Sequence, residues 1–353
     1  MSEEVKIRMI VKAIVKYFGI VIAAGFLISF QYQLLVLKSR NNPEYKPVNP
    51  TERRVGMAYG LWMDAENWGN TWGTPLLGKY DSRGRTVIRK HAEWLTDAGV
   101  DFIWLDWSNQ INYDPNKLWN GGRQDLIEDA TAILFDEYSK LEKRPKISIF
   151  IGVTGAPEAA DDGRLQKKAD QIFNMYVANQ KYADLWERYL GKPLLVVYVN
   201  TPSPWQNGIP GWDDERFTVR WMTGYVSEQT NLVTPEHISK YGYWSWEDRG
   251  PQTFPVFNGY PEAMVINAAT REQQASGQYV FIPAKGRRNG ETFKESWARA
   301  REIGPKFAMV VSWNEWVKGE QPSAEISKDI EPSEEFGLLY LQLLKEEITG
   351  FKH

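Results

Sequence analysis

Short apolar runs alternate with helical patterns of apolar residues along most of this chain. Eight runs have the length and the β-branched or aromatic content typical of buried strands. They are Val55–Leu61, Phe102–Asp106, Ile147–Ile151, Leu194–Val199, Thr218–Trp221, Tyr241–Trp244, Ala263–Asn267 and Phe307–Ser312. Because each run is short and nearly continuous in hydrophobicity, we expect both faces of the resulting sheet to be covered.

Helical patterns lie between these runs. We predict helices at Arg85–Ala98, Asp125–Leu141, Arg164–Tyr189, Thr292–Ile303 and, as a single turn, Arg271–Ala275. Gly99 and Gly304 follow the first and the fourth of these ranges directly, as glycine often does where a helix ends. Strands that alternate with helices predict parallel βαβ units, and eight such units predict a (β/α)₈ TIM barrel, of the α/β class, over residues 54–353.

The amino-terminal segment has a different pattern. Residues from Tyr17 to Leu37 are apolar except for Ser29, Gln31 and Gln33, and four basic residues precede them: Lys6, Arg8, Lys12 and Lys16. A helix of about 20 apolar residues is long enough to span a bilayer, and a basic flank favours a cytoplasmic amino terminus. We therefore expect a transmembrane anchor in residues 1–38, a polar linker in 39–53 and an extracytoplasmic barrel. A signal peptide, cleaved to give a secreted protein, is the alternative.

Composition excludes several classes of function. The net charge of −3 provides no basic surface for nucleic acid. The chain has no cysteine and only three histidines, far apart in sequence, so we expect no metal site, no cofactor and no histidine-based triad. The absence of cysteine and of N-glycosylation sequons favours a bacterial cell envelope over a eukaryotic secretory lumen. The 16 tryptophans and 17 tyrosines exceed what one core needs and favour surfaces that stack on sugar rings.

Carboxylates lie beside tryptophans where four of the predicted strands end. The four segments are Trp62-Met63-Asp64-Ala65-Glu66, Asp106-Trp107-Ser108-Asn109, Trp244-Ser245-Trp246-Glu247 and Trp313-Asn314-Glu315-Trp316. In a (β/α)₈ barrel the carboxyl ends of the strands meet at one rim, where functional groups gather. We therefore predict a carbohydrate site at this rim, although a buried tryptophan also commonly serves as core.

Glu315 is the carboxylate to which this hypothesis gives the central role. Its position between Trp313 and Trp316 predicts partial desolvation, which raises the pKa of a carboxyl toward the range useful for proton transfer. The alternative is a strand end whose aromatic residues cap the core and whose glutamate makes a structural hydrogen bond.

The run Ser312-Trp313-Asn314-Glu315-Trp316, with Gly319 and Ile330-Glu331-Pro332 after it, resembles the signature of glycoside hydrolase family 99. That family holds endo-α-mannosidases and WbsX-like proteins, and the Arg287-Arg288 pair resembles the segment that leads into its last strand. The resemblance implies a metal-independent (β/α)₈ hydrolase in which Glu315 assists attack by the sugar's own 2-hydroxyl. It also implies a second glutamate as general acid and base.

This chain has Lys318 where the family has that second glutamate. A lysine is a poor acid near neutrality, because its unperturbed pKa is about 10.4. Another carboxylate would have to replace the missing one, and the candidates are Glu320, Glu247, Asp106 and Glu66.

The leading hypothesis is therefore an endo-acting glycoside hydrolase with Glu315 and a second carboxylate. The alternatives are a barrel that binds carbohydrate without cleaving it and a transferase-related protein of glycan assembly. We expect the substrate to contact twelve residues: Trp62, Asp64, Glu66, Trp107, Asn109, Tyr198, Trp244, Trp246, Arg288, Trp313, Asn314 and Trp316.

Overall fold

The structure is a computed structural model, and it describes residues 45–112, 124–153, 157–199, 212–225, 244–247, 252–274, 281–319 and 321–353. The predicted anchor and the catalytic candidate Glu320 therefore lie outside the described residues. Within the ranges that are described, no helix is both long enough and apolar enough to cross a membrane.

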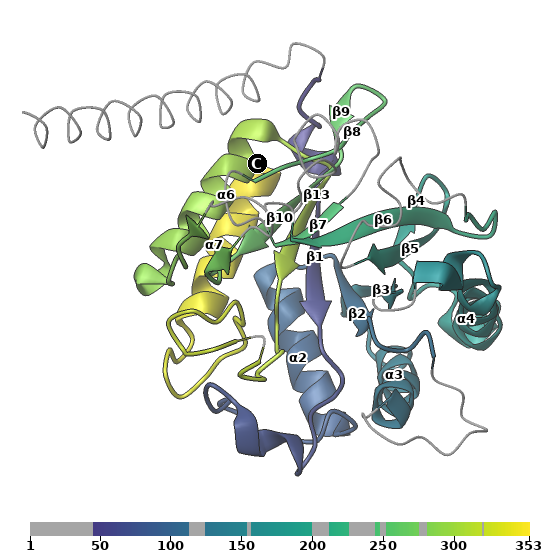
Figure 1. Ribbon diagram of the computed structural model, residues 1–353, viewed down its shortest axis with the longest axis horizontal. Helices are drawn as coiled ribbons and strands as arrows, with labels where there is room; N and C mark the ends of the chain where they lie inside the picture. Colours follow the sequence, from purple (N-terminus) through teal and green to yellow (C-terminus); the bar gives the residue numbers. More distant parts are fainter. Residues whose placement is uncertain are drawn as a thin grey trace, which may run out of the picture. The chain divides into compact units, whose positions relative to one another are not determined.

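Eight parallel strands form a nearly closed barrel in the middle of the structure (Figure 1). Their order around the sheet is β10 (Ala263–Asn267), β13 (Phe307–Val311), β1 (Arg54–Tyr59), β2 (Phe102–Trp107), β3 (Lys146–Gly152), β5 (Lys192–Val199), β6 (Thr218–Tyr225) and β7 (Trp244–Glu247). Strand β7 packs next to β10 and so brings the two edges together. The predicted TIM barrel is confirmed, and each predicted strand coincides with or overlaps an observed one, although Tyr241 to Tyr243 lie outside the described residues.

Alternation along each strand divides the core into an inner and an outer part. Phe102 and Trp104 of β2 point into the barrel, where they meet Phe150 and Met309. The intervening Ile103 and Leu105, and Trp107 after them, point outward against the helices. Successive side chains of a strand lie on opposite faces, so the two residues of any neighbouring pair at a strand end have different surroundings.

Helices cover the outside of the barrel (Figure 1). They are α2 (Arg85–Ala98), α3 (Gln124–Tyr138), α4 (Arg164–Ile172), α6 (Glu291–Ile303) and α7 (Leu339–Lys352). The end of α2 shows why the sequence pattern predicted it well. Gly99 has φ 88°, which L-residues with a side chain rarely adopt, and its N–H donates to the carbonyls of Leu95 and Thr96.

Two helix predictions are wrong. The helix predicted for Arg164–Tyr189 ends at Ile172, a π-helical turn at Phe173–Val177 follows, and β4 (Arg188–Tyr189) pairs antiparallel with the start of β5. The turn predicted at Arg271–Ala275 contains β11 (Gln273–Gln274), which pairs with β12 (Phe281–Ile282). In both places a short antiparallel pairing with the strand that follows along the chain replaces the predicted helical turn.

Candidate active site

Glu315 lies just beyond the carboxyl end of β13, on a loop that leaves the strand through the cis peptide bond between Val311 and Ser312. Its side chain is 5% exposed. Its Oε2 atom accepts a hydrogen bond from Gln321 Nε2 and lies 3.8 Å from Lys328 Nζ and 3.1 Å from Ser312 Oγ, whose one proton also faces the closer Asp329 Oδ1 at 2.6 Å. An amide donor and an ammonium group thus face this oxygen, and the Ser312 hydroxyl lies next to it.

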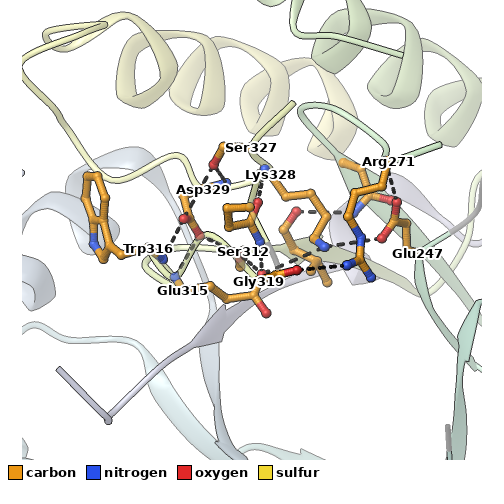
Figure 2. A network of polar contacts seen from close by, with 12 residues as sticks. Glu247, Arg271, Ser312, Glu315, Trp316, Gly319, Ser327, Lys328 and Asp329 are labelled. Atoms are coloured by element: carbon orange, nitrogen blue, oxygen red, sulfur yellow. Dashed lines mark hydrogen bonds and ion pairs between the residues drawn. The ribbon is translucent and has the colours of Figure 1, made fainter. Parts of the chain in front are cut away.

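Asp329 lies behind this loop and determines its conformation (Figure 2). Its Oδ1 accepts the N–H of Glu315 at 2.7 Å and the Ser312 hydroxyl at 2.6 Å, while its Oδ2 accepts the N–H of Trp316 and the indole N–H of Trp72, both at 2.7 Å. Burial raises the pKa of Asp329, and these hydrogen bonds oppose that effect. One buried carboxyl therefore satisfies two successive backbone donors and fixes the direction in which Glu315 leaves the chain.

Lys328 joins Glu315 to a second carboxylate. It is fully buried, and its Nζ lies 3.2 Å from Glu247 Oε2 and 3.8 Å from Glu315 Oε2 (Figure 2). Together these distances bound the separation of the two glutamate oxygens at about 7 Å. Glycosidases place their two carboxyl groups about 5–5.5 Å apart for retention and about 6.5–9.5 Å apart for inversion. The two acids are thus close enough to interact, and the ammonium of Lys328 contacts both of them.

Glu247 is the last residue of β7 and is fully buried. Trp244 and Trp246 point into the barrel, so alternation directs Glu247 outward, where Oε1 accepts the N–H of Arg271 at 3.0 Å. Both of its oxygens thus have partners within the protein. Glu247 is placed to hold Lys328 rather than to face a substrate.

Asp106 has the opposite orientation. It follows Trp104 in the inward alternation of β2, one residue before the strand ends, and is 6% exposed. Its Oδ1 accepts the N–H of Ser108 at 2.7 Å. This carboxyl is therefore at the inner side of the rim, on a strand whose backbone both neighbours hold in place.

Aromatic rings line the barrel interior below this rim. Trp246 stacks on Phe150 with ring centroids 5.3 Å apart and an interplanar angle of 8°, and Tyr198 contacts the other rings from β5. Tyr198 is half-buried and Trp246 is 6% exposed. Of the predicted sugar contacts, these two share the inward face with Asp106.

Four predicted stacking residues have no exposed ring, and that expectation is corrected. Trp107 points outward and its indole N–H donates to Thr131 Oγ1 at 2.9 Å, because alternation gives the inward direction to Asp106. Trp244 lies deep in the barrel and donates to Glu262 at 2.9 Å. Trp313 packs against His91, and Trp316 stacks on Trp72 with centroids 4.7 Å apart. These rings are core, as the alternative interpretation of a tryptophan-rich strand end held.

Trp62 remains beside the candidate site. It is half-buried, and its Nε1 donates to the carbonyl oxygen of Glu315 at 3.1 Å. Asp64 and Glu66, which follow Trp62, form a local turn: Asp64 Oδ1 accepts the N–H of Glu66 at 3.0 Å, and the Glu66 side chain is exposed. Asn314 is buried and exchanges hydrogen bonds with both backbone groups of Gly60, so it joins the ends of β13 and β1.

Two other residues that we predicted to contact the sugar make no contact with Glu315 among the described residues. Asn109 is exposed on the loop after β2. Arg288 is also exposed and forms an ion pair with Glu295. Arg287, its neighbour in the sequence, is buried. The Arg287 guanidinium lies over the rings of Tyr340 and Phe336 and donates to the carbonyl oxygen of Ala324.

A second buried network lies under Trp316 and involves residues that the sequence did not identify. His91 lies between the Tyr59 hydroxyl, 2.7 Å from Nδ1, and Glu331 Oε1, 2.9 Å from Nε2. Glu331 Oε2 accepts from the Tyr80 hydroxyl and the Trp316 indole at 2.7 and 2.8 Å. Burial raises the pKa of Tyr80 well above its usual value, so the hydroxyl stays protonated as a donor. Glu331 of the Ile330-Glu331-Pro332 motif is thus a support of the loop.

Lys328, Gln321 and Asp329 were also missed, although they surround Glu315. They lie between the Ser312–Trp316 motif and Ile330, and no sequence spacing relates them to the end of a strand. The nearest sequence signal was the Ile330-Glu331-Pro332 motif, which directly follows Asp329.

Comparison with known proteins supports the fold. No family model matches this chain, and no curated protein matches it. Among solved structures, the family 99 endo-α-mannosidase from Bacteroides thetaiotaomicron, in complex with bis-tris-propane, is similar with a TM-score of 0.56 and 15% identity. The match covers 84% of this chain and 97% of that one. A protein described as glycoside hydrolase-like is similar with a TM-score of 0.51 and 16% identity, over 87% of this chain and 96% of its own. These neighbours have the barrel that the Ser-Trp-Asn-Glu-Trp motif led us to expect.

Proposed function

We propose that this protein is a glycoside hydrolase that cleaves an oligosaccharide or polysaccharide with Glu315 as one of its two carboxyl groups. One observation carries the proposal: in a barrel of the family 99 type, the Glu315 carboxylate lies beyond the end of β13 with Ser312, Gln321 and Lys328 directed at it. Groups at the carboxyl ends of barrel strands are where such folds carry their chemistry.

The carboxylate form of Glu315 can accept a proton. In this proposal it assists attack at the anomeric carbon, by the sugar's 2-hydroxyl as the family resemblance implies. The hydrogen bond from Gln321 orients the carboxylate beside the Ser312 hydroxyl, and Asp329 keeps its backbone in place.

Asp106 is the second carboxyl group that we favour. Glu247 has both oxygens occupied by Lys328 and the Arg271 N–H, and Lys318, at the position of the family acid, is exposed. Asp106 follows Trp104 on the inward face of β2 at the same rim, and Trp104 contacts Trp246 with ring centroids 5.4 Å apart. In this proposal Asp106 protonates the leaving oxygen, while Trp62, Trp246 and Tyr198 contact the sugar rings.

A barrel that binds carbohydrate without cleaving it is the second candidate. The observation that favours it is the pair of lysines: Lys318 replaces the family acid, and the ammonium of Lys328 contacts both Glu315 and Glu247. A carboxylate held in this way could accept hydrogen bonds from sugar hydroxyls and do no chemistry.

Release of reducing ends separates the two candidates. Purified full-length protein is incubated with a panel of α- and β-linked glycans, and Glu315→Gln is compared with the wild type. For a hydrolase, the wild type releases reducing ends, the variant does not, and the variant still binds glycan. Binding without release by the wild type would favour the second candidate, and release by the variant would remove Glu315 from the mechanism. Activity that survives EDTA would support metal independence.

We also propose that residues 1–38 anchor the protein in a membrane with the barrel outside the cytoplasm. The apolar stretch from Tyr17 to Leu37 and the basic residues before it support this. Protease protection of the amino terminus in intact cells, with cleavage of the barrel, is the expected result. A chain whose amino terminus begins after residue 38 would show instead that the segment is removed.

A further inference from the structure

Two hairpins at the amino-terminal end of the barrel carry exposed apolar side chains. One is the turn between β4 and β5, with Leu190 56% exposed. The other joins β8 (Val256–Phe257) to β9 (Tyr260–Pro261), where Phe257 is 36% and Tyr260 45% exposed. In the part of the chain that is described, these are three of the six exposed large hydrophobic residues. We call this set, Leu190, Phe257 and Tyr260, the hairpin surface.

The two hairpins are neighbours. The guanidinium of Arg220 lies 5.1 Å from the ring of Tyr189 and 4.8 Å from the ring of Phe257, so one side chain contacts both hairpins. Phe257 and Tyr260 are opposite each other across their antiparallel pair. The exposed groups thus belong to one region rather than to scattered positions.

The exposed charged residues within the two hairpins are basic, whereas the adjoining Glu187 and Glu262 are buried in ion pairs with Arg54 and Arg220. Arg188 and Lys192 are exposed on the first hairpin, and neither 188–192 nor 256–261 contains an acidic residue. Apolar and aromatic side chains beside cations are the combination found where proteins meet the headgroups of a bilayer. Anionic lipid would add attraction for the two cations.

The chain itself leads to this end of the barrel. The N–H of Lys46 donates to the carbonyl of Gly259, in the turn of the second hairpin, at 2.7 Å. Eight residues, 38–45, separate Lys46 from the apolar stretch that ends at Leu37. Eight extended residues reach at most about 29 Å. An anchor in residues 1–38 therefore keeps the hairpin surface within that distance of the membrane.

We propose that the hairpin surface lies against the phospholipid bilayer, with Leu190, Phe257 and Tyr260 in the interfacial layer and the Glu315 end of the barrel directed away from the membrane. The proposal rests on the anchor proposed above and is independent of the hydrolase assignment. It places the sugar site where glycan outside the membrane can reach it.

The absence of cysteine allows a direct test. Single variants Leu190→Cys and Tyr260→Cys of the full chain are labelled with an environment-sensitive fluorophore and placed in nanodiscs of phosphatidylcholine and phosphatidylglycerol. The matched controls are Leu76→Cys and Leu338→Cys, which have similar exposure of 45% and 44% and lie on loops after β1 and before α7. Emission is compared with and without lipid that carries a nitroxide near the headgroup.

Labels at 190 and 260 should shift to the blue and lose about half of their emission to the nitroxide, while labels at 76 and 338 should not, because interfacial side chains lie within the headgroup and acyl boundary. If the protein enters nanodiscs but all four labels behave alike, the proposal that the hairpin surface contacts the bilayer is wrong, and the proposal of a membrane anchor is retained. If the protein does not enter nanodiscs, the proposed anchor and the proposed bilayer contact are both wrong. Reducing-end release remains a separate measurement in either case.

Discussion

Lys328 Nζ lies 3.2 Å from Glu247 Oε2, and both side chains are fully buried. Removing one partner of a buried ion pair leaves an uncompensated charge without water, which costs about 3–5 kcal/mol. We expect Lys328→Met to lower the free energy of unfolding by that amount, as measured by urea denaturation.

The double variant Lys328→Met/Glu247→Leu should recover part of this loss, because both buried charges of the pair are then gone while Glu315 still lacks its contact with Lys328. Lys90→Met is the matched control, since Lys90 forms an exposed ion pair with Glu93 at 2.6 Å and such pairs contribute little. A Lys328→Met protein as stable as the wild type would show that Lys328 is hydrated or reoriented in solution.

Asp106 and Glu247 can be distinguished by conservative amide substitutions. If Asp106 is the general acid, Asp106→Asn should reduce kcat by about 10²–10⁴-fold with little change in stability. Glu247→Gln should instead lower the free energy of unfolding, because Lys328 loses a buried partner.

The measurement is reducing-end release together with thermal unfolding of each variant. Activity retained in Asp106→Asn and lost in a fully folded Glu247→Gln would reverse the assignment of the second carboxyl group.

Trp316 is expected to matter for stability and Trp246 for glycan binding. Trp316→Phe keeps an aromatic ring against Trp72 but leaves Glu331 without the indole donor, a loss of about 1–3 kcal/mol. Trp246→Phe should weaken glycan affinity more than it changes the free energy of unfolding.

Calorimetric binding and denaturation of the two variants test this difference. Weaker glycan binding by a fully stable Trp316→Phe protein would show that Trp316 contacts the sugar and is not only part of the core.

Glu137 provides a prediction on pH. Burial alone would raise the pKa of this carboxyl, but hydrogen bonds from Lys140, Arg85 and Arg89 outweigh it and lower the pKa to about 2. A carboxyl with a lower pKa in the folded protein stabilises the fold above its unfolded pKa, which is about 4.3, and this contribution disappears as the pH falls through about 2.

Glu137→Gln should therefore be less stable than the wild type at pH 7, and the difference should shrink as the pH falls from about 4.3 toward 2. Urea denaturation at several pH values measures it. A difference that does not depend on pH would mean that Glu137 acts through packing rather than charge.

Much of the barrel could be predicted from the sequence because strand length, hydrophobicity and helix-ending glycines are local properties. The runs from Val55 and Phe307 and the helix stopped by Gly99 are examples. Strict alternation also determines which of two adjacent side chains on a strand faces the barrel interior. Asp106 and Trp107 are adjacent on one strand and could not both face a sugar.

The motif around Glu315 placed one carboxylate at the rim, and the sequence by itself determined that much. Which groups surround this carboxylate was decided only by the tertiary structure. Lys328, Gln321 and Asp329 follow the motif on a loop that folds back, and Glu247 reaches Lys328 from the end of β7. Periodicity reports which face of a strand or helix is apolar. It carries no information on where an irregular segment packs. The course of such a segment depends on hydrogen bonds between buried polar groups that are distant in the sequence.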